Sequence, residues 1–330
     1  MDHVRTARPA LVGGCIILSV VVIINTTIMS IRVTTESVVS QAPLINTYDD
    51  EDSAGTSTRL IQQAAISQRF QRLPQCLIIG ARKGGTRALL DALSLHSQIR
   101  IVHHEMHFFN SNETYAKGLE WYRSQMPHTS EEQVTIEKTP GYYTNEYAPQ
   151  RAYQMNSSLK LILIVRDPVI RVISDFTQVL YTKQDRNKSR PVFEDEVFIN
   201  GSNRINIDYK PVRNSLYAIH MQQWLKYFPL SSFLILDGDI FIHNPLSQLK
   251  QVERFLGLPP EINESQLVFN RHKGFFCFRR RGRRTAKCLG HTKGRAHVYV
   301  SKYSQHRLRV KLRPHNRKFY HLVNRWWNWD

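Results

Sequence analysis

The stretch CLIIGARKGGTRALL, residues 76–90, combines three patterns that predict a strand, a loop and a helix in that order. The opening apolar run is typical of a buried parallel strand, and the closing leucines fall on one face of a helix. Between them, Lys83 adds a positive charge to a loop whose glycines permit close backbone approach and whose helix N-terminus offers free N–H groups. The stretch therefore indicates a phosphate-binding loop. The alternative is a plain strand-to-helix turn at Gly84 and Gly85.

Two nucleotide-binding motifs are absent from this loop. The Walker A pattern finds its glycine spacing at Gly80 and Gly85, but Thr86 and Arg87 stand where it requires Lys and then Ser or Thr. The lysine needed at the β- and γ-phosphates and the hydroxyl needed on magnesium are therefore displaced. This argues against a P-loop kinase or ATPase, and the dinucleotide fingerprint G-x-G-x-x-G is missing as well.

Apolar runs and amphipathic segments alternate along the rest of the chain. The predicted strands are 76–80, 99–103, 134–140, 159–168 and 233–239. The predicted helices are 86–96, 169–181, 215–228 and 246–258. This alternation predicts a single P-loop-like α/β domain whose central parallel sheet carries helices on both faces. Ligands bind such sheets at the carboxyl ends of the strands, and GARKGGTR (80–87), EKTP (137–140) and RDP (166–168) all fall there.

An uncharged stretch near the N-terminus predicts a membrane anchor. Residues 10–31 are long enough, at ~1.5 Å per helical residue, to cross a bilayer core of about 30 Å. Arg5 and Arg8 precede it, so the positive-inside rule places the N-terminus in the cytosol. A cleaved signal peptide is the alternative. The resulting segments are a cytoplasmic tail (1–9), a signal-anchor helix (10–31), a flexible lumenal stem (32–72) and a folded domain (73–330).

The cysteines and sequons fit a lumenal domain. Cys15 lies in the apolar span and Cys76 in a predicted buried strand, which leaves Cys277 and Cys288 as the natural disulfide in an oxidising compartment. Zinc is a poor alternative for this pair because no second ligand pair follows at finger spacing. Sequons for N-glycosylation begin at Asn112, Asn156, Asn187, Asn200 and Asn263.

Positive charge is concentrated near the C-terminus. The formal net charge is +18, and residues 271–330 hold 18 Lys or Arg and a single acid, so 18 − 1 = +17 of it lies there. A charge run is usually a solvated face, but a run this one-sided favours a polyanionic partner: nucleic acid, anionic lipid or acidic polysaccharide. A hydrophobic content of 42% excludes wholesale disorder.

Ten motifs, in order from about Pro74 to Asp330, resemble the heparan sulfate glucosaminyl 3-O-sulfotransferases. They are KGGTRALL (83–90), E-x-HFF (105–109), EKTPGYY (137–143), LIVRDPVIRVISDFTQV (163–179), NIDYKPVRNSLY (206–217), WLKYFPL (224–230), VERFLGL (252–258), KGFFC (273–277), CLG (288–290) and KGRAH (293–297). The first motif alone would be weak, whereas ten in order are specific. The resemblance implies a Golgi enzyme that transfers a sulfuryl group from 3′-phosphoadenylyl sulfate to the 3-hydroxyl of glucosamine in heparan sulfate.

The resemblance assigns catalytic roles to four residues. Glu105 is the expected general base, and His107 is expected to orient its carboxylate. Lys83 is expected to stabilise the leaving oxygen, and Lys138 to position the acceptor or neutralise the sulfuryl oxygens. The alternatives are a surface carboxylate for Glu105, a packed core residue for His107 and a solvated lysine for Lys138.

The resemblance also implies a donor site and an acceptor site. Arg166 and Ser174 match a clamp on the 3′-phosphate of the donor, although Arg166 could instead pair with a carboxylate. The donor site comprises Lys83, Gly84, Gly85, Thr86, Arg87, Arg166, Ser174, Phe276, Lys293, Gly294, Arg295, Ala296 and His297. The acceptor site comprises Arg87, Glu105, His107, Asn110, Lys138 and Gln178. Because lysines and arginines carry the charge in this reaction, no metal is expected.

Three positions depart from the family pattern. Asn110 stands where Asp is usual, Phe276 where Tyr is common, and His104 where relatives often carry Asn or Lys. An amide at position 110 can hydrogen-bond a sugar but offers no charge, which is expected to alter acceptor preference or rate. The RRRGRR run (279–284) either extends the polymer footprint or is only exposed surface.

Rival functions remain. A non-catalytic, polyanion-binding membrane protein would explain the basic C-terminal region, but not three motifs at successive strand ends. A sulfotransferase acting at another position or on another glycan is a closer alternative. A domain placed beyond a membrane anchor argues against nucleic acid as the partner. The expected partners are therefore heparan sulfate and, through one N-terminal helix, a membrane; oligomeric state is not indicated.

Overall fold

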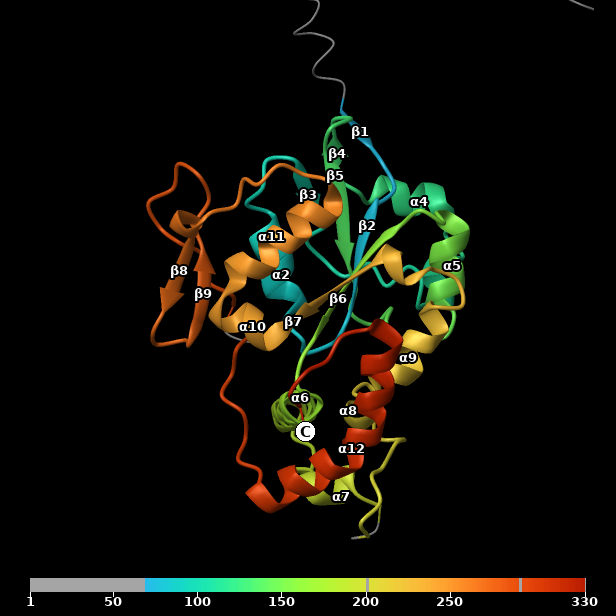
Figure 1. Ribbon diagram of the computed structural model, residues 1–330, viewed down its shortest axis with the longest axis vertical. Coiled ribbons are helices and arrows are strands. Elements are labelled where there is room, and N and C mark those ends of the chain that lie inside the picture. Colours follow the sequence, from blue (N-terminus) through green and yellow to red (C-terminus); the bar gives the residue numbers. More distant parts are fainter. Residues whose placement is uncertain (1–68, 200–201, 291–292, 330) are drawn as a thin grey trace, which may run out of the picture. The chain divides into compact units, whose positions relative to one another are not determined.

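A five-stranded parallel sheet organises the part of the chain that the computed structural model describes, residues 69–199, 202–290 and 293–329 (Figure 1). Its strand order is β3-β5-β2-β6-β7, and every neighbouring pair is parallel. The sheet strands are β2 (Cys76–Gly80), β3 (Ile99–Ile101), β5 (Val134–Lys138), β6 (Lys160–Val165) and β7 (Phe233–Asp237). Two antiparallel pairs lie outside this sheet, formed by β1 (Phe70–Gln71) with β4 (His128–Thr129) and by β8 (Leu267–Asn270) with β9 (Phe275–Phe278).

Helices cover both faces of the sheet, which confirms the predicted fold class. They are α2 (Thr86–Leu93), α3 (Asn112–Tyr115), α4 (Gly118–Ser124), α5 (Ala148–Met155), α6 (Pro168–Asp185), α7 (Phe193–Val197), α8 (Lys210–Arg213), α9 (Tyr217–Trp224), α10 (Gly238–His243), α11 (Pro245–Leu256) and α12 (Lys302–Val323). Two short 3₁₀ turns are Leu230–Ser232 and Glu264–Gln266. In Figure 1, α2 and α11 lie on one side of the sheet, and α4, α5 and α9 lie on the other.

The alternation of strand side chains divides the core into two layers. In β2, Leu77 and Ile79 pack into a cluster that includes buried residues of α4, α5 and α9. Cys76 and Ile78 point to the opposite face, where they join the apolar residues of α2 and α11. All four side chains are fully buried, which explains why this strand reads as a continuous apolar run rather than an alternating one.

Four of the five strands end earlier than predicted: β3 at Ile101, β5 at Lys138, β6 at Val165 and β7 at Asp237, and side-chain caps explain the last two. The run 159–168 is a strand only to Val165, because the Asp167 side chain accepts two backbone N–H groups and so caps α6. The run 233–239 is a strand only to Asp237, whose side chain caps α10 in the same way. Both strands therefore turn directly into a helix at the carboxyl edge of the sheet.

The long C-terminal helix α12 was not predicted from the sequence. Its apolar residues are few and are separated by basic ones, yet Leu308, Leu312 and Phe319, spaced one and two helical turns apart, are fully buried. Arg309 also forms an ion pair with Asp167 at 2.8 Å, so some of the basic C-terminal charge faces the domain. The helix packs against α6 and α9, and its end carries Phe319 into the main core cluster.

The N-terminal predictions lie largely outside the described residues. The predicted tail (1–9), anchor (10–31) and most of the stem (32–72) are not described. Within the described residues, no helix is both long and apolar enough to span a bilayer. The end of the predicted stem is ordered, since Phe70 and Gln71 pair with β4 and the Gln71 amide donates to the carbonyls of Ser124 and Met126.

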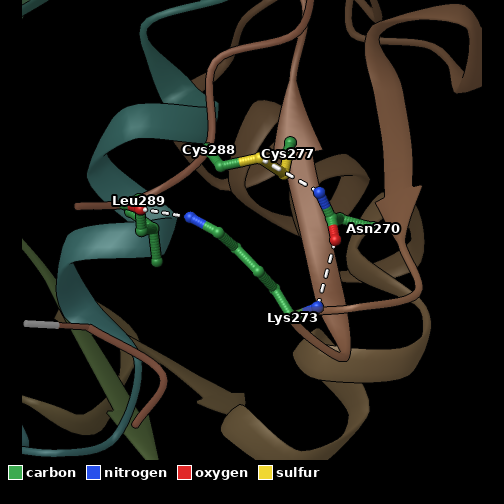
Figure 2. The surroundings of a disulfide bond; sticks show 5 residues. All are labelled: Asn270, Lys273, Cys277, Cys288 and Leu289. Carbon is green, nitrogen blue, oxygen red and sulfur yellow. Dashed lines mark hydrogen bonds between the residues drawn. A yellow bond between two sulfur atoms is a disulfide. The ribbon is translucent and has the colours of Figure 1, made fainter. Parts of the chain in front are cut away.

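A disulfide joins Cys277 in β9 to Cys288, the pair indicated by the sequence (Figure 2). Nearby hydrogen bonds tie the same unit together. The Asn270 side-chain oxygen accepts from the Lys273 backbone N–H at 3.0 Å, and Lys273 Nζ donates to the Leu289 carbonyl at 3.2 Å. The hairpin and the chain that follows the disulfide therefore form one connected unit.

Truncating the α12 anchor tests how far the domain depends on this helix. We expect Phe319→Ala to lower the free energy of unfolding by about 3–5 kcal/mol, because the fully buried ring leaves a cavity in the main core. Lys318→Ala is the matched control: it removes an exposed neighbour and should change stability by no more than about 0.5 kcal/mol. Chemical denaturation of both variants gives the comparison. Equal, small effects would mean that α12 is only loosely attached.

Candidate active site

The loop that follows β2 lies at the point where the connections of the sheet change direction. The chain leaves β2 toward β3 on one side, while β6 and β7 lie on the other side. In doubly wound sheets this switch point is where ligands bind. The loop enters α2 through Gly85, which has a φ of 115°, and Lys83 itself adopts a left-handed φ of 68°. The strained conformation at Lys83 is typical of functional loops.

A cavity of about 430 Å³ opens in front of this loop. We call it the donor cavity. It contains twelve of the thirteen residues predicted for the donor: Lys83, Gly84, Gly85, Thr86, Arg87, Arg166, Ser174, Phe276, Lys293, Gly294, Arg295 and His297. Ala296 is the exception, since it does not line this cavity. The remaining wall is largely apolar, with Phe241, Ile242 and Phe275 among its residues.

The donor cavity fits a nucleotide that carries anionic groups at two ends. Lys83 and the start of α2 form one cationic region, while Arg166 and Ser174 form another. Arg166 Nε is held by Asp239 at 2.8 Å, so the carboxylate alternative raised from the sequence is real, yet the same residue still lines the cavity. Apolar side chains such as Phe241 can accept a flat ring. Cations, apolar walls and a helix N-terminus together match a phosphorylated nucleotide.

Burial lowers the pKa of Lys83 to about 8, below its usual 10.5. Asp175 opposes the shift, and the nearby cations Arg82 and Lys293 add to it. Burial also lowers the pKa values of Lys293 and His297, which line the same cavity. A site in which several cations lower one another's affinity for protons is prepared for an anionic ligand.

A second cavity of about 350 Å³ adjoins the first. We call it the acceptor cavity. Lys83, Thr86, Arg87 and Lys293 line both cavities and so mark their junction. The acceptor-cavity lining also includes the cations Arg82, Lys210 and Arg213, but only one carboxylate, Glu105. The lining therefore favours an anionic ligand and places one carboxylate beside it.

Glu105 lines the acceptor cavity and contacts two side chains, Lys138 and His107. Lys138 Nζ donates to its Oε1 at 2.5 Å, and His107 Nε2 lies 3.5 Å from its Oε2. The hydrogen bond with His107 and the contact with Lys138 lower the pKa of Glu105 to about 2, against the opposing effect of burial. In return, the bond to Glu105 raises the pKa of His107. The carboxylate is therefore ionised at every physiological pH.

Some predicted acceptor residues occupy other places. Lys138 is buried and lines neither cavity, so it contacts Glu105 from the protein interior. Gln178 lines the donor cavity instead of the acceptor cavity. Asn110 does line the acceptor cavity, and its Nδ2 lies 3.3 Å from His107 Nδ1. The amide thus extends the chain of polar contacts that runs to Glu105 through His107.

Sequence reasoning missed a buried carboxylate that supports these polar contacts. Glu137, in β5, is fully buried, and burial raises its pKa. Its Oε1 accepts from Thr139 Oγ1 at 2.5 Å and from the Met106 backbone N–H at 3.4 Å. Thr139 Oγ1 in turn accepts from the His107 N–H at 3.3 Å. Glu137 therefore holds the backbone of the two residues that follow Glu105, Met106 directly and His107 through Thr139. Only the tertiary structure reveals this role.

A second missed network supports the loop after β2. Arg171 is fully buried, and its Nη1 donates to the Arg82 carbonyl at 3.2 Å and to Asp175 Oδ2 at 3.0 Å. Asp175 also accepts from Arg82 Nε at 2.9 Å. Two residues of α6 thereby fix the position of Arg82, the residue that precedes Lys83. The arginine in VIRVISDF gave a possible signal, because a charge within an otherwise apolar helical face needs a buried partner.

The site gives no indication of a metal-binding cluster. Among residues 69–199, 202–290 and 293–329, no three His, Cys, Asp or Glu side chains gather closely enough to hold an ion.

Comparison with known proteins agrees with this architecture. Residues 73–321 match the sulfotransferase domain family. A crystal structure of a sulfotransferase from Alicyclobacillus acidocaldarius has the same fold, with a TM-score of 0.59 at 16% identity over 78% of this chain and 99% of that one.

Curated relatives give a narrower assignment. Heparan sulfate glucosamine 3-O-sulfotransferase 5 of Mus musculus is 46% identical over 268 residues, covering 81% of this chain and 77% of the relative. Heparan sulfate glucosamine 3-O-sulfotransferase 3A1 of Mus musculus is 42% identical over 282 residues, covering 85% and 69%. The resemblance drawn from the sequence motifs is confirmed: the chain belongs to the heparan sulfate glucosamine 3-O-sulfotransferase family, within the sulfotransferase domain family.

Proposed function

We propose that this protein transfers a sulfuryl group from 3′-phosphoadenylyl sulfate to the 3-hydroxyl of a glucosamine residue in heparan sulfate. The observation that carries the proposal is the junction of the two cavities, where Lys83 lines both cavities and Glu105 lines the acceptor cavity. A sulfuryl group held at this junction would have a cation beside its leaving oxygen and a base beside the incoming hydroxyl. Family membership supplies the donor and acceptor classes.

The donor would lie along the donor cavity with its phosphosulfate at the loop after β2. Lys83 and the free N–H groups at the start of α2 would receive the 5′-phosphosulfate. Arg166 and Ser174 would receive the 3′-phosphate, since both line the same cavity on the side of α6. Asp239 orients the guanidinium through Nε, which leaves Arg166 pre-positioned for the ligand.

The reaction is an in-line displacement at sulfur. The acceptor oxygen forms a bond to sulfur as the bond from sulfur to the bridging phosphate oxygen breaks, and adenosine 3′,5′-bisphosphate departs. Glu105 takes the proton that the hydroxyl loses, and Lys83 stabilises the negative charge that grows on the leaving oxygen. The product is a sulfate ester of the sugar.

A carboxylate with a low pKa can serve as the base here because proton transfer occurs late. The hydroxyl becomes strongly acidic only once its oxygen has begun to bond to sulfur. Glu105 is ionised throughout, with a pKa of about 2, so no competing proton has to be removed first. His107 and Lys138 hold the carboxylate in one orientation. These contacts make Glu105 a weaker base but fix its position relative to the acceptor.

The acceptor cavity supports a sulfated and carboxylated sugar chain as substrate. Arg82, Arg87, Lys210 and Arg213 surround the base with positive charge. Screening by salt should therefore weaken acceptor binding. Asn110, the position at which the family resemblance leads us to expect Asp, adds an uncharged hydrogen-bonding group to this wall. We infer that this amide tolerates an anionic group on the acceptor better than a carboxylate would.

We further propose that the enzyme is a single-pass type II protein of the Golgi membrane with its catalytic domain in the lumen. The uncharged residues 10–31 and the preceding arginines support this orientation. The disulfide between Cys277 and Cys288 agrees with an oxidising compartment.

Removing the base tests its assigned role. We expect Glu105→Gln to lower kcat by roughly 10²- to 10⁴-fold, because the amide fills the same space but cannot take a proton. Transfer of labelled sulfate to defined heparan oligosaccharides gives the rate, and analysis of the product identifies the modified hydroxyl. Calorimetry gives the affinity for adenosine 3′,5′-bisphosphate, which should change by less than about threefold, because Glu105 does not line the donor cavity.

The matched control is Glu132→Gln, which removes an exposed carboxylate that lines neither cavity. It should retain full activity. Unchanged transfer in Glu105→Gln would remove the base from the mechanism. A product sulfated at a position other than the 3-hydroxyl would keep the base but change the proposed regiochemistry.

The lowered pKa of Lys83 predicts an alkaline limit to donor capture. A lysine is cationic below its pKa, so kcat/KM for the donor should hold its plateau below about pH 8 and fall as the pH rises further. Lys83→Arg should be slower but should lose this alkaline limb, because a guanidinium stays charged. Glu105 should add no acidic limb above about pH 4, since its pKa is about 2. An alkaline limb that persists unchanged in Lys83→Arg would assign the titration to another group.

A further inference from the structure

The unit formed by β8, β9 and the chain after them carries an unusual excess of positive charge. Residues 265–290, here called the basic hairpin, contain eight Lys or Arg and no Asp or Glu. These cations are Arg271, Lys273, Arg279, Arg280, Arg281, Arg283, Arg284 and Lys287. Only Lys273 lines the donor cavity, and none of the eight lines the acceptor cavity. The proposed reaction therefore leaves most of this charge without a role.

Four of these arginines point into solvent, and the charge of one of them, Arg281, also helps to lower the pKa of Glu261. Arg280, Arg281, Arg283 and Arg284 are all exposed, and none of them forms an ion pair with another described residue. Their neighbours are held differently: Arg279, for example, donates to the Ser265 carbonyl. Four like charges within five residues repel one another, which opposes folding unless an anion offsets the repulsion.

The fold keeps these four charges together. The disulfide between Cys277 and Cys288 closes the loop that contains them. Inside the disulfide, Phe278 and Lys287 form an antiparallel bridge with two backbone hydrogen bonds, at 3.0 and 2.8 Å. The arginines therefore project from a loop whose two ends are fixed side by side, so binding a polyanion would cost little conformational entropy.

The donor cavity is lined by residues along the hairpin, from the turn through β9 to Phe278, and by Leu289 beyond the disulfide. The four arginines follow Phe278 and line neither cavity. β8 and β9 are antiparallel, with Asn270 paired to Phe275 at the turn and Leu267 paired to Phe278 at the loop end. The turn supplies Lys273 and Gly274 to the donor cavity wall. In Figure 1 the hairpin flanks the domain outside α10 and α11, away from α8, whose residues line the acceptor cavity.

We propose that the basic hairpin is a second binding surface for the polysaccharide, which holds a stretch of the chain distant from the sugar being sulfated. This inference rests on the proposed function, because it takes the same polymer as its ligand. An acceptor cavity of about 350 Å³ encloses only a small part of such a chain. A repeating polyanion offers further sulfate and carboxylate groups, and arginine forks bind both. A second contact on one chain raises its effective concentration at the first.

The test compares a long substrate with a short one. We remove the four charges together, as Arg280→Gln, Arg281→Gln, Arg283→Gln and Arg284→Gln in the full chain. With polymeric heparan sulfate, KM should rise roughly tenfold, and its dependence on salt concentration should become shallower. With a heparan hexasaccharide, kcat and KM should stay within about twofold of the wild type, because a short chain reaches only the acceptor cavity.

A matched variant controls for net charge. Lys226→Gln, Arg254→Gln, Lys302→Gln and Lys318→Gln remove the same charge from exposed positions that lie outside the hairpin and both cavities. This variant should leave the KM for the polymer within about twofold. An equal rise in both variants, or none in the hairpin variant, would overturn the proposal.

Two further outcomes are distinct. If the hairpin variant keeps its KM for the polymer but loses binding to vesicles of phosphatidylcholine and phosphatidylserine, the surface serves a membrane and the proposal is wrong. Failure of the wild type to sulfate the hexasaccharide would instead count against the proposed function. The two proposals can therefore fail separately.

Discussion

The loop after β2 can occupy its place only because three backbone segments meet with no side chain between them. A Cβ atom on Gly84 would collide with the carbonyl oxygen of Ile164 in β6, and one on Gly238 would collide with the carbonyl oxygen of Gly84. The same Ile164 oxygen accepts a hydrogen bond from the Ala81 N–H at 2.9 Å. The loop after β2, the end of β6 and the start of α10 are thereby locked at one edge of the sheet. The position of Lys83, and with it the junction of the two cavities, follows from this contact.

The proposed base depends on a different kind of constraint. Glu105 lies on an irregular segment, and a buried carboxylate beneath that segment holds its backbone. That carboxylate, Glu137, belongs to β5. The position of the proposed base is therefore fixed by hydrogen bonds to a sheet residue, because Glu105 itself does not belong to a strand. Lys138, the next residue along the same strand, contacts the base directly. Adjacent residues of one strand therefore divide two tasks, holding the segment and holding the carboxylate.

The cationic side chains of the C-terminal region have at least three kinds of surroundings. Arg309 pairs with Asp167 at the start of α6 and helps to attach the last helix. Lys293 lines both cavities and belongs to the proposed site. The arginines of the basic hairpin face solvent. The net charge therefore combines cations with different surroundings: one in an ion pair, one in the proposed donor site and several on the proposed polysaccharide surface.

The local pattern of residues determined the strands, the loop after β2 and most of the residues that line the donor cavity. Apolar runs and glycines act over a few residues, so CLIIG and KGGTR carry their own structure, and parallel strands bring their ends to one edge. Only the tertiary structure decided what depends on contacts between distant segments. Helix α12 could not be predicted from the sequence because its few buried side chains are stabilised by packing against α6 and α9. Gln178 lines the donor cavity, and Lys138 contacts the carboxylate of Glu105. Glu137 and Arg171 became supports because burial leaves a charge stable only beside partners from elsewhere in the chain.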